Sequence, residues 1–183
     1  MGEADYPRAS TVVRRSMNNK YLWVGTIIGI VLVLDQVTKY IIEKRVVIHE
    51  VIPVIPGFFN ITQVRNKGAA FSLLANSPEV FRSLFFTAVT IVAVVVIALL
   101  IRKAHERLLI VAFSLIAGGA IGNLIDRMRY GEVVDFIQWY VKSFYWPSFN
   151  IADSAITAGV CLLVFDMLIY KSHNTGSGRT ADR

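Results

Sequence analysis

The residues best suited to chemistry in this sequence of 183 residues are carboxylates that stand beside long apolar runs. Asp153 follows Asn150 in the stretch FNIADSAITAG, where an apolar run begins, and Asp135 stands in the stretch GEVVDF. Two carboxyl groups that are held close together cannot both ionise cheaply. One then keeps its proton while the other can deprotonate water. This combination is typical of aspartic protease chemistry.

Each of these two carboxylates also has a purely structural interpretation. Asn150, shortly after Pro147, resembles a helix N-cap, with Asp153 favourably placed at the positive end of the helix. Asp135 alone is compatible with a solvated loop carboxylate next to Glu132. Capping explains why Asp153 is tolerated at the end of an apolar run. It does not explain why Asp135 should reach the same place.

Other catalytic chemistries lack the residues that they need. The three histidines, His49, His105 and His173, are scattered, so a Ser-His-Asp or Cys-His arrangement has no base near the polar stretches. The one cysteine, Cys161, lies within an apolar run and cannot form an intrachain disulfide or a thiolate zinc cluster. The sequence contains no HExxH motif and no glycine-rich phosphate loop after a strand. We therefore predict no metal site and no cofactor.

The composition is typical of a membrane protein. Hydrophobic residues make up 55% of the chain and charged residues 17%, against about 45–50% and about 25% in an average soluble domain. The formal net charge of +6 raises the question of nucleic-acid binding. The Lys and Arg residues cluster beside the apolar runs, however, so they are better explained as charges that flank a membrane. We predict no nucleic-acid partner.

Four apolar runs are long enough to cross a bilayer, because about 20 helical residues cover its roughly 30 Å hydrocarbon core. These runs lie at about residues 21–42, 81–101, 108–125 and 151–170. The first is too long for a signal peptide, and no small-x-small cleavage site follows it. We therefore predict that it is a membrane anchor and that the fold is a membrane α-protein with four transmembrane helices.

We predict one four-span domain at residues 19–171, between flexible tails at residues 1–18 and 172–183. Lys and Arg are slightly more numerous in the tails and in the short RKAHER loop than in the two longer loops on the opposite side. By the positive-inside rule, this bias predicts that both termini are cytoplasmic and that loops 43–80 and 126–150 face outward.

The two outer loops differ in character. Loop 43–80 is rich in β-branched residues and is interrupted by prolines and a glycine, so we predict two or three short strands in it. Loop 126–150 is dense in aromatic residues, which suit the headgroup layer of a membrane. Four apolar residues of this second loop recur at helical spacing: Ile137, Tyr140, Val141 and Phe144. They predict an amphipathic segment, in part helical, that lies on the membrane.

The alternating direction of four spans gathers polar residues at one face of the membrane, and this convergence is the strongest indication of function. The residues concerned are Asp35, Lys39, Asn66, Asn123, Asp126, Arg127, Asp135, Asn150 and Asp153. Asp35 and Lys39 are four residues apart on a helix, so they can form an ion pair. Asp126 and Arg127 allow either an ion pair at the end of span three or a direct role.

Two further features have structural explanations. Gly118 and Gly122 form a small-xxx-small pattern, which predicts that another helix packs closely against span three. Asp166 lies near the opposite end of span four, close to Lys171. Pairing or snorkelling is a sufficient explanation there, and we assign Asp166 no function.

Three other functions are compatible with polar groups in membrane spans. An ion transporter would place its acids near the midplane, in broken helices of repeated halves, and no repeat is visible here. A lipid-headgroup transferase would use paired acids to hold a metal, so a chelator would inhibit it. A non-enzymatic scaffold would use polar pairs only to orient its helices.

Five stretches of the sequence resemble the family of lipoprotein signal peptidases, the bacterial signal peptidase II. They are LDQVTK (34–39), RNKGAAFSLL (65–74), GGAIGNLIDR (118–127), GEVVDF (131–136) and FNIADSAITAG (149–159). The resemblance covers about residues 20–170, with the stretches in the family's order and spacing. It implies an intramembrane aspartic endopeptidase that cleaves prolipoproteins on the N-terminal side of a diacylglyceryl-modified cysteine.

The resemblance also implies roles for individual residues. Asp135 and Asp153 correspond to the two catalytic aspartates of the family. Its supporting and substrate-binding residues correspond to Asp35, Lys39, Asn66, Asn123, Arg127 and Asn150. The first outer loop resembles a small periplasmic β-cradle and the second a helix that covers the substrate. The expected partners are lipidated prolipoproteins and membrane lipid, and the expected location of the protein, as a monomer, is the bacterial inner membrane, with its active site near the periplasmic face.

Overall fold

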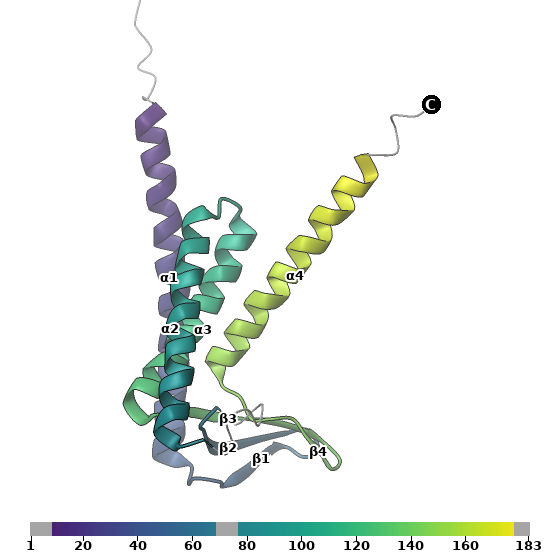
Figure 1. Ribbon diagram of the computed structural model, residues 1–183. Coiled ribbons are helices and arrows are strands. Elements are labelled where there is room, and N and C mark those ends of the chain that lie inside the picture. The colour runs from purple at the N-terminus through teal and green to yellow at the C-terminus, as the bar shows by residue number, and fades with distance from the viewer. Residues whose placement is uncertain (1–8, 69–76, 178–183) are drawn as a thin grey trace, which may run out of the picture.

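The computed structural model describes residues 9–68 and 77–177, and these ranges form four long helices and one small set of strands (Figure 1). The helices are α1 (Ala9–Arg45), α2 (Glu79–Lys103), α3 (Arg107–Tyr130) and α4 (Ile151–Ser177). The strands are β1 (Val51–Ile55), β2 (Phe59–Asn66), β3 (Val133–Val141) and β4 (Phe144–Tyr145).

All four helices are long and apolar enough to cross a membrane. The candidate spans are Asn19–Arg45, Val80–Lys103, Arg107–Tyr130 and Ile151–Ile169. Large apolar side chains cover the outside of the helices; Leu22 of α1 and Val80 of α2, for example, are each 70% exposed. A helix with so much exposed apolar surface is stable in hydrocarbon and not in water. The four predicted crossings are therefore confirmed as helices that suit a membrane.

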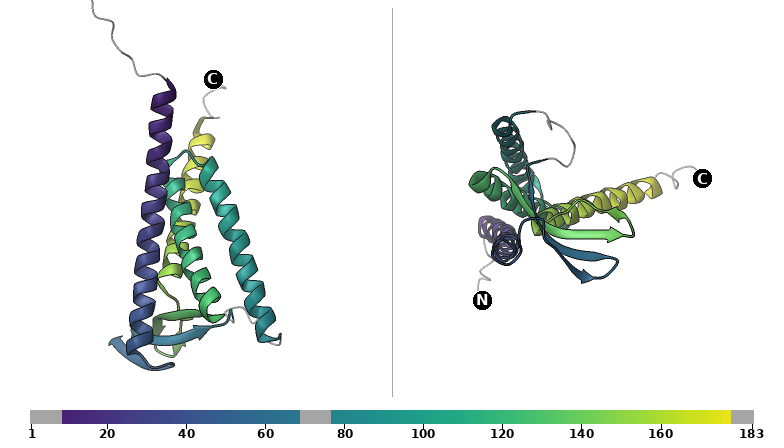
Figure 2. Two further views of the ribbon diagram at one scale, coloured as in Figure 1. Left: turned by 90° about the vertical axis from the view of Figure 1, so that its left-hand side faces the viewer. Right: turned by 90° about the horizontal axis from the view of Figure 1, so that it is seen from below.

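Helix α3 lies at the centre of the bundle and contacts the other three helices (Figure 2). Its glycines permit this close contact. A Cβ atom on Gly118 would lie 2.9 Å from the Cβ of Val31 on α1, and one on Gly122 would lie 2.7 Å from a carboxylate oxygen of Asp35. The close packing predicted for these two glycines is confirmed. On the other side of α3, Gly119 lies directly against the backbone carbonyl of Ala152 at the start of α4.

The strands lie across one end of the helix bundle, in the antiparallel order β1-β2-β3-β4 (Figure 1). Strands β1 and β2 come from loop 43–80, as predicted. Strand β3 pairs with β2, with Val64 opposite Asp135 and Asn66 opposite Val133. The sheet thus joins residues 51–66 to residues 133–145, two segments that are far apart in sequence.

The helix predicted in part of residues 126–150 is wrong. Residues Val133–Val141 form β3 and residues Phe144–Tyr145 form β4. The stretch VVDFIQWYV is rich in β-branched and aromatic residues, and β2 offers it an edge with unpaired N–H and C=O groups. Pairing along that edge is a long-range effect, and it outweighs the helical spacing of the apolar residues.

Helices α1 and α4 extend beyond residues 19–171, the range predicted for the four-span domain. Helix α1 begins at Ala9 and not near residue 19, and α4 extends to Ser177. Neither proline nor glycine interrupts the stretch from Ala9 to Lys20, and extending an existing helix adds a hydrogen bond for each residue that is fixed. The predicted tails at residues 1–8 and 178–183 lie outside the described residues.

The first turn of α1 and the last turn of α4 lie at the same end of the bundle, together with the turn between α2 and α3 (Figure 1). The strands lie at the opposite end. The polar residues that the sequence predicts to converge can therefore meet at one end of the molecule. This is the end that carries the sheet.

Candidate active site

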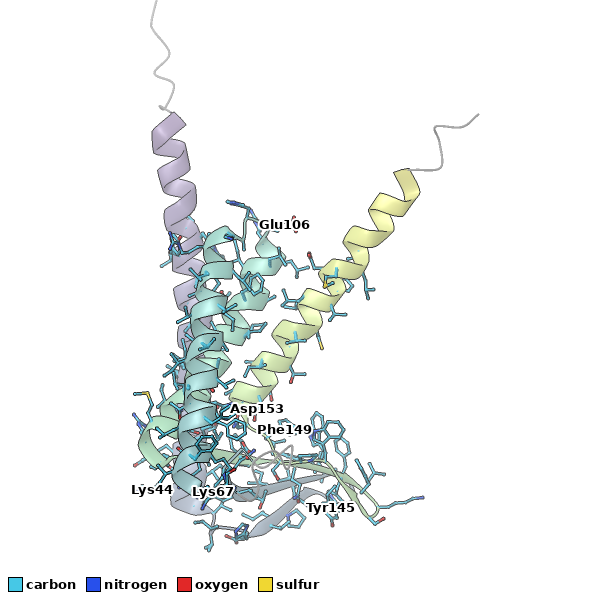
Figure 3. All side chains as sticks on the ribbon, viewed as in Figure 1. Lys44, Lys67, Glu106, Tyr145, Phe149 and Asp153 are labelled. Atoms are coloured by element: carbon cyan, nitrogen blue, oxygen red, sulfur yellow. The ribbon has the colours of Figure 1, made fainter. Side chains whose placement is uncertain are left out.

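Asp153 lies in the first turn of α4, at the end of the bundle that carries the sheet (Figure 3). The backbone N–H of Asp153 donates to Oδ1 of Asn150 at 2.9 Å, and the N–H of Asn150 donates to Oδ2 of Asp153 at 3.2 Å. This reciprocal arrangement is a capping box, so the structural interpretation of Asn150 and Asp153 is confirmed. It also leaves the Asp153 carboxylate at the positive end of the helix, where negative charge is stabilised.

Asp135 is the third residue of β3 and is 1% exposed. Val64 of β2 is opposite Asp135, so Asn66, two residues further along β2, is its diagonal neighbour on the same face. Nδ2 of Asn66 donates to Oδ2 of Asp135 at 2.9 Å. Oδ1 of Asn66 accepts from the N–H of Gly68 at 2.8 Å, which orients the side-chain amide. The side chain of Asn66 therefore binds the chain two residues further on with its oxygen and the carboxyl of Asp135 with its nitrogen.

The backbone of Phe149 attaches the start of α4 to β3. Its carbonyl accepts from the N–H groups of Phe136 and Ile137, at 3.0 and 2.8 Å, and its N–H donates to the carbonyl of Ile137 at 3.0 Å. Phe136 follows Asp135 directly, and Phe149 precedes the helix cap. These backbone hydrogen bonds bring the two predicted catalytic carboxyls, 18 residues apart in the chain, to one place.

Two asparagines connect the carboxyl groups. Nδ2 of Asn150 donates to Oδ1 of Asp135 at 2.7 Å, while the backbone of the same residue binds Asp153. Nδ2 of Asn123, on α3, donates to Oδ1 of Asp153 at 2.8 Å, and its Oδ1 lies 3.2 Å from Nδ2 of Asn150. Each of the four carboxylate oxygens thus accepts at least one amide hydrogen bond.

The surroundings of Asp135 favour its neutral form. Burial raises the pKa of its carboxyl from the ordinary 3.8 to about 7, and the charge of Asp153 acts in the same direction. The hydrogen bonds from Asn66 and Asn150 and the charge of Lys39 oppose this rise only in part. Asp135 therefore holds its proton close to neutral pH, which is the property expected of one member of an acid pair.

A buried ionic cluster lies behind these residues. Nζ of Lys39 lies 2.8 Å from Oδ2 of Asp35, which confirms the predicted pair on α1, and 2.8 Å from Oδ2 of Asp126 on α3. All three side chains are at most 3% exposed. Of the two interpretations of Asp126, the ion pair is present, but its partner is Lys39 on another helix and not the neighbouring Arg127.

Arg127 lies next to the carboxyl pair without a direct bond to it among the described residues. Its Nη1 lies 3.4 Å from Oγ1 of Thr90 on α2, and the charges of Asp153 and Asp135 act on it. Arg127 is only partly buried, so its guanidinium is accessible beside the two carboxyls.

All eight predicted site residues gather at this end of the bundle, but the sequence also left contributors unassigned. Nε2 of Gln36 lies 3.1 Å from Oδ2 of Asp35 and 3.0 Å from Oδ1 of Asp126, so Gln36 belongs to the ionic cluster. Its position directly after Asp35 in LDQVTK was the available signal. Arg65 binds Glu43 of α1 at 2.6 Å and lies over the ring of Tyr130 at 4.8 Å, which ties β2 to two helices.

Residues without a predicted role lie elsewhere. Asp166 is 13 residues after Asp153 on α4, which is about 20 Å at a helical rise of 1.5 Å per residue. Cys161 is exposed on the apolar surface of α4. Within the described ranges, no three His, Cys, Asp or Glu side chains are grouped so that they could hold a metal ion. The hydrogen bonds to the carboxyls of Asp135 and Asp153 come from amide groups of Asn66, Asn123 and Asn150.

Comparison with known proteins agrees with this geometry. The model of a family described as signal peptidase (SPase) II matches residues 27–169. A lipoprotein signal peptidase of Geobacter metallireducens is 49% identical over 154 residues, which are 83% of this chain and 94% of the relative. A lipoprotein signal peptidase of Syntrophus aciditrophicus is 48% identical over 142 residues, 76% of this chain and 88% of the relative.

Two solved structures are similar as well, each described as a bacterial membrane enzyme determined by the in meso method. The one at 2.3 Å resolution has a TM-score of 0.72 and 37% identity, and the match covers 87% of this chain and 93% of the other. The one at 1.9 Å has a TM-score of 0.70 and 41% identity, with coverage of 79% and 92%. The chain therefore belongs to the signal peptidase II family, membrane proteases that remove the signal peptide from prolipoproteins by an aspartic mechanism.

Proposed function

We propose that Asp135 and Asp153 are the catalytic pair with which this signal peptidase cleaves a prolipoprotein on the N-terminal side of its diacylglyceryl-modified cysteine. The observation that carries the proposal is the position of Asn150. One residue donates to both carboxyls, from its side chain to Asp135 and from its backbone to Asp153. A structural cap for α4 needs the bond to Asp153 alone, so the second bond is best explained by an acid pair.

The surroundings of the two carboxyls assign their roles. Asp153 is partly exposed, lies at a helix N-terminus and accepts a backbone N–H, so it is the ionised partner and the general base that activates water. Asp135 is buried in the sheet and retains its proton, so it donates a hydrogen bond to the scissile carbonyl. The water attacks that carbonyl carbon and passes one proton to Asp153. As the peptide bond breaks, Asp153 passes this proton on to the leaving amide nitrogen, so the products are an amine and a carboxylic acid and Asp153 is ionised again.

The supporting residues act on the pair or on the peptide. Asn66, Asn123 and Asn150 hold the carboxyl groups in place through the hydrogen bonds described above. Arg127 is the charged donor with a partly exposed guanidinium at the site, and it binds the peptide backbone near the scissile bond. Asp35 and Lys39 support the site from behind.

The substrate and the membrane fit the same arrangement. The signal helix of a lipidated precursor docks against the exposed apolar faces of the helices, with its acyl chains in the bilayer. The protein lies in the bacterial inner membrane as a monomer, with both termini in the cytoplasm and the sheet at the periplasmic face. The distribution of Lys and Arg supports this orientation, and the location of both helix termini at the end opposite the sheet is consistent with it.

The test is cleavage of a lipidated precursor by the purified variants Asp135→Asn, Asp153→Asn and Asp166→Asn, at equal amounts of folded protein. We expect no detectable turnover by the first two and nearly normal turnover by the third, which removes a carboxyl from the same membrane helix but not from the site. Turnover by either of the first two variants would refute the pair. EDTA should leave the wild type active; inhibition by EDTA would favour a metal-dependent enzyme instead.

A further inference from the structure

The ammonium group of Lys39 donates in three directions. It lies 2.8 Å from Oδ2 of Asp35, 2.8 Å from Oδ2 of Asp126 and 3.0 Å from Oδ1 of Asn123. A lysine ammonium has three N–H donors, so these three acceptors use its whole capacity. Lys39 is 3% exposed and is held by α1, while two of its partners belong to α3. This cluster is therefore a rigid link between two helices.

Each of the three acceptors also forms a hydrogen bond with a catalytic aspartate or with the residue directly before it. Oδ1 of Asp35 accepts the N–H of Ala152 at 2.9 Å, one residue before Asp153. Asn123 donates directly to Asp153 at 2.8 Å. Oδ2 of Asp126 accepts the N–H of Val134 at 3.2 Å, one residue before Asp135. Lys39 is thus connected to α4 through two partners and to β3 through Asp126.

We propose that Asp126 is a positioning residue for the cleavage reaction, which fixes the backbone of β3 at Asp135 against the Lys39 cluster and hence against Asp153. The proposal rests on the assignment of Asp135 and Asp153 as the catalytic pair. Asp126 does not touch the reacting atoms. It acts through the N–H of Val134.

The charges of the cluster support this role. Lys39 and Asp35 form a neutral pair without Asp126, so the second carboxylate adds a buried negative charge. Charges are expensive to bury, so a buried carboxylate needs partners that satisfy its oxygens. Asp126 is 2% exposed, and its oxygens accept from Gln36, Lys39 and Val134. Of these three bonds, the one to Val134 is the one that connects Asp126 to β3.

Small displacements at this position should affect the rate strongly. A catalytic group that is displaced by about 1 Å can lose about 100-fold in rate. In β3 the backbone of Val134 and Asp135 is continuous, so a shift of one moves the other. Substrate binding uses other groups, and KM should therefore be insensitive to Asp126.

Two variants separate the effect of the position of the Asp126 carboxylate from the effect of its charge. Asp126→Glu keeps the charge beside Lys39 but moves the carboxylate by one methylene away from its present contact with Val134. Asp126→Asn keeps the shape and an acceptor oxygen but removes the charge. Asp166→Glu and Asp166→Asn, on the distant part of α4, are matched controls for the same chemical changes. All are compared in the precursor-cleavage assay, with folded protein quantified and Tm measured in the same detergent.

We expect Asp126→Glu to lower kcat about 10- to 100-fold, with KM within about two-fold of the wild type and nearly unchanged Tm. Asp126→Asn should lower kcat as well, together with Tm, and the Asp166 variants should match the wild type. If kcat per folded molecule of Asp126→Glu equals that of the wild type, or if kcat and Tm of both Asp126 variants fall in proportion, the proposal is overturned. An active wild type and an inactive Asp135→Asn in the same assay show that such a failure concerns Asp126 alone.

Discussion

Nδ2 of Asn150 lies 2.7 Å from Oδ1 of Asp135, which joins the cap of α4 to the first part of β3. Asn150 is fully buried, and its Oδ1 caps the helix by accepting the N–H of Asp153. The side-chain oxygen of Asn150 thus caps the helix, and its side-chain nitrogen holds the carboxyl of Asp135 in place. The start of α4 and the acid pair are therefore a single structural unit.

The two roles of Asn150 can be separated by substitution. Serine is about as good an N-cap as asparagine, so Asn150→Ser should keep the cap of α4 but lose the donor to Asp135. We expect Asn150→Ser to lose about 100-fold in kcat with a small change in Tm. Asn150→Ala should lose a similar factor and also about 1 kcal/mol of stability. Steady-state cleavage and thermal unfolding in detergent measure both effects, and a fully active Asn150→Ser would show that the bond to Asp135 is dispensable.

Activity should fall as the pH rises above neutral. The pKa of Asp135 is raised to about 7 because its carboxyl is buried. The neutral form that donates to the scissile carbonyl is present below this pH and is lost as the pH rises through it. We expect kcat/KM to decrease about tenfold per pH unit above about pH 7. The pH profile of Asp166→Asn should coincide with that of the wild type, whereas constant activity up to pH 9 would contradict a protonated Asp135.

The same raised pKa predicts that Asp135→Asn stabilises the folded protein at alkaline pH. Since the folded pKa lies above the ordinary 3.8, the folded state loses stability as the pH rises from about 4 to about 7. This loss approaches about 4 kcal/mol for a shift of roughly three pKa units. Asparagine does not titrate, so Tm of Asp135→Asn should exceed that of the wild type at pH 8, and by less at pH 5. An equal difference in Tm at pH 5 and pH 8 would show that the difference does not arise from the raised pKa of Asp135.

Close packing of α3 against α4 should be essential to the site. A Cβ on Gly119 would collide with the backbone carbonyl of Ala152, next to Asp153, and this atom cannot rotate away. We expect Gly119→Ala to destabilise the protein by about 1–3 kcal/mol and to lower kcat by displacing α4. Gly29→Ala on α1 meets no atom within 4 Å and is the matched control. Thermal unfolding and cleavage by the two variants test this, and equal behaviour would refute the tight contact.

Much of this architecture could be predicted from local sequence. Burial of apolar residues in hydrocarbon requires only length and composition, so the four helices were correctly predicted, although α1 and α4 extend beyond the predicted domain boundaries. The pair Asp35–Lys39 and the cap at Asn150 depend on residues within one turn of helix, and both are present. Asp135 and Asp153 could be singled out because a carboxylate beside apolar residues is unfavourable unless it has partners.

Tertiary structure alone determined which partners these residues have. Asp126 binds Lys39 of α1 and not its neighbour Arg127, because α1 and α3 pack closely at Gly118 and Gly122. Residues 133–141 form a strand and not a helix because β2 lies beside them and offers hydrogen bonds that no local segment supplies. Sequence by itself determined the membrane helices, their caps and the types of chemical groups. The separation and pairing of those groups depend on contacts between segments far apart in the chain, and spacing along one segment does not encode such contacts.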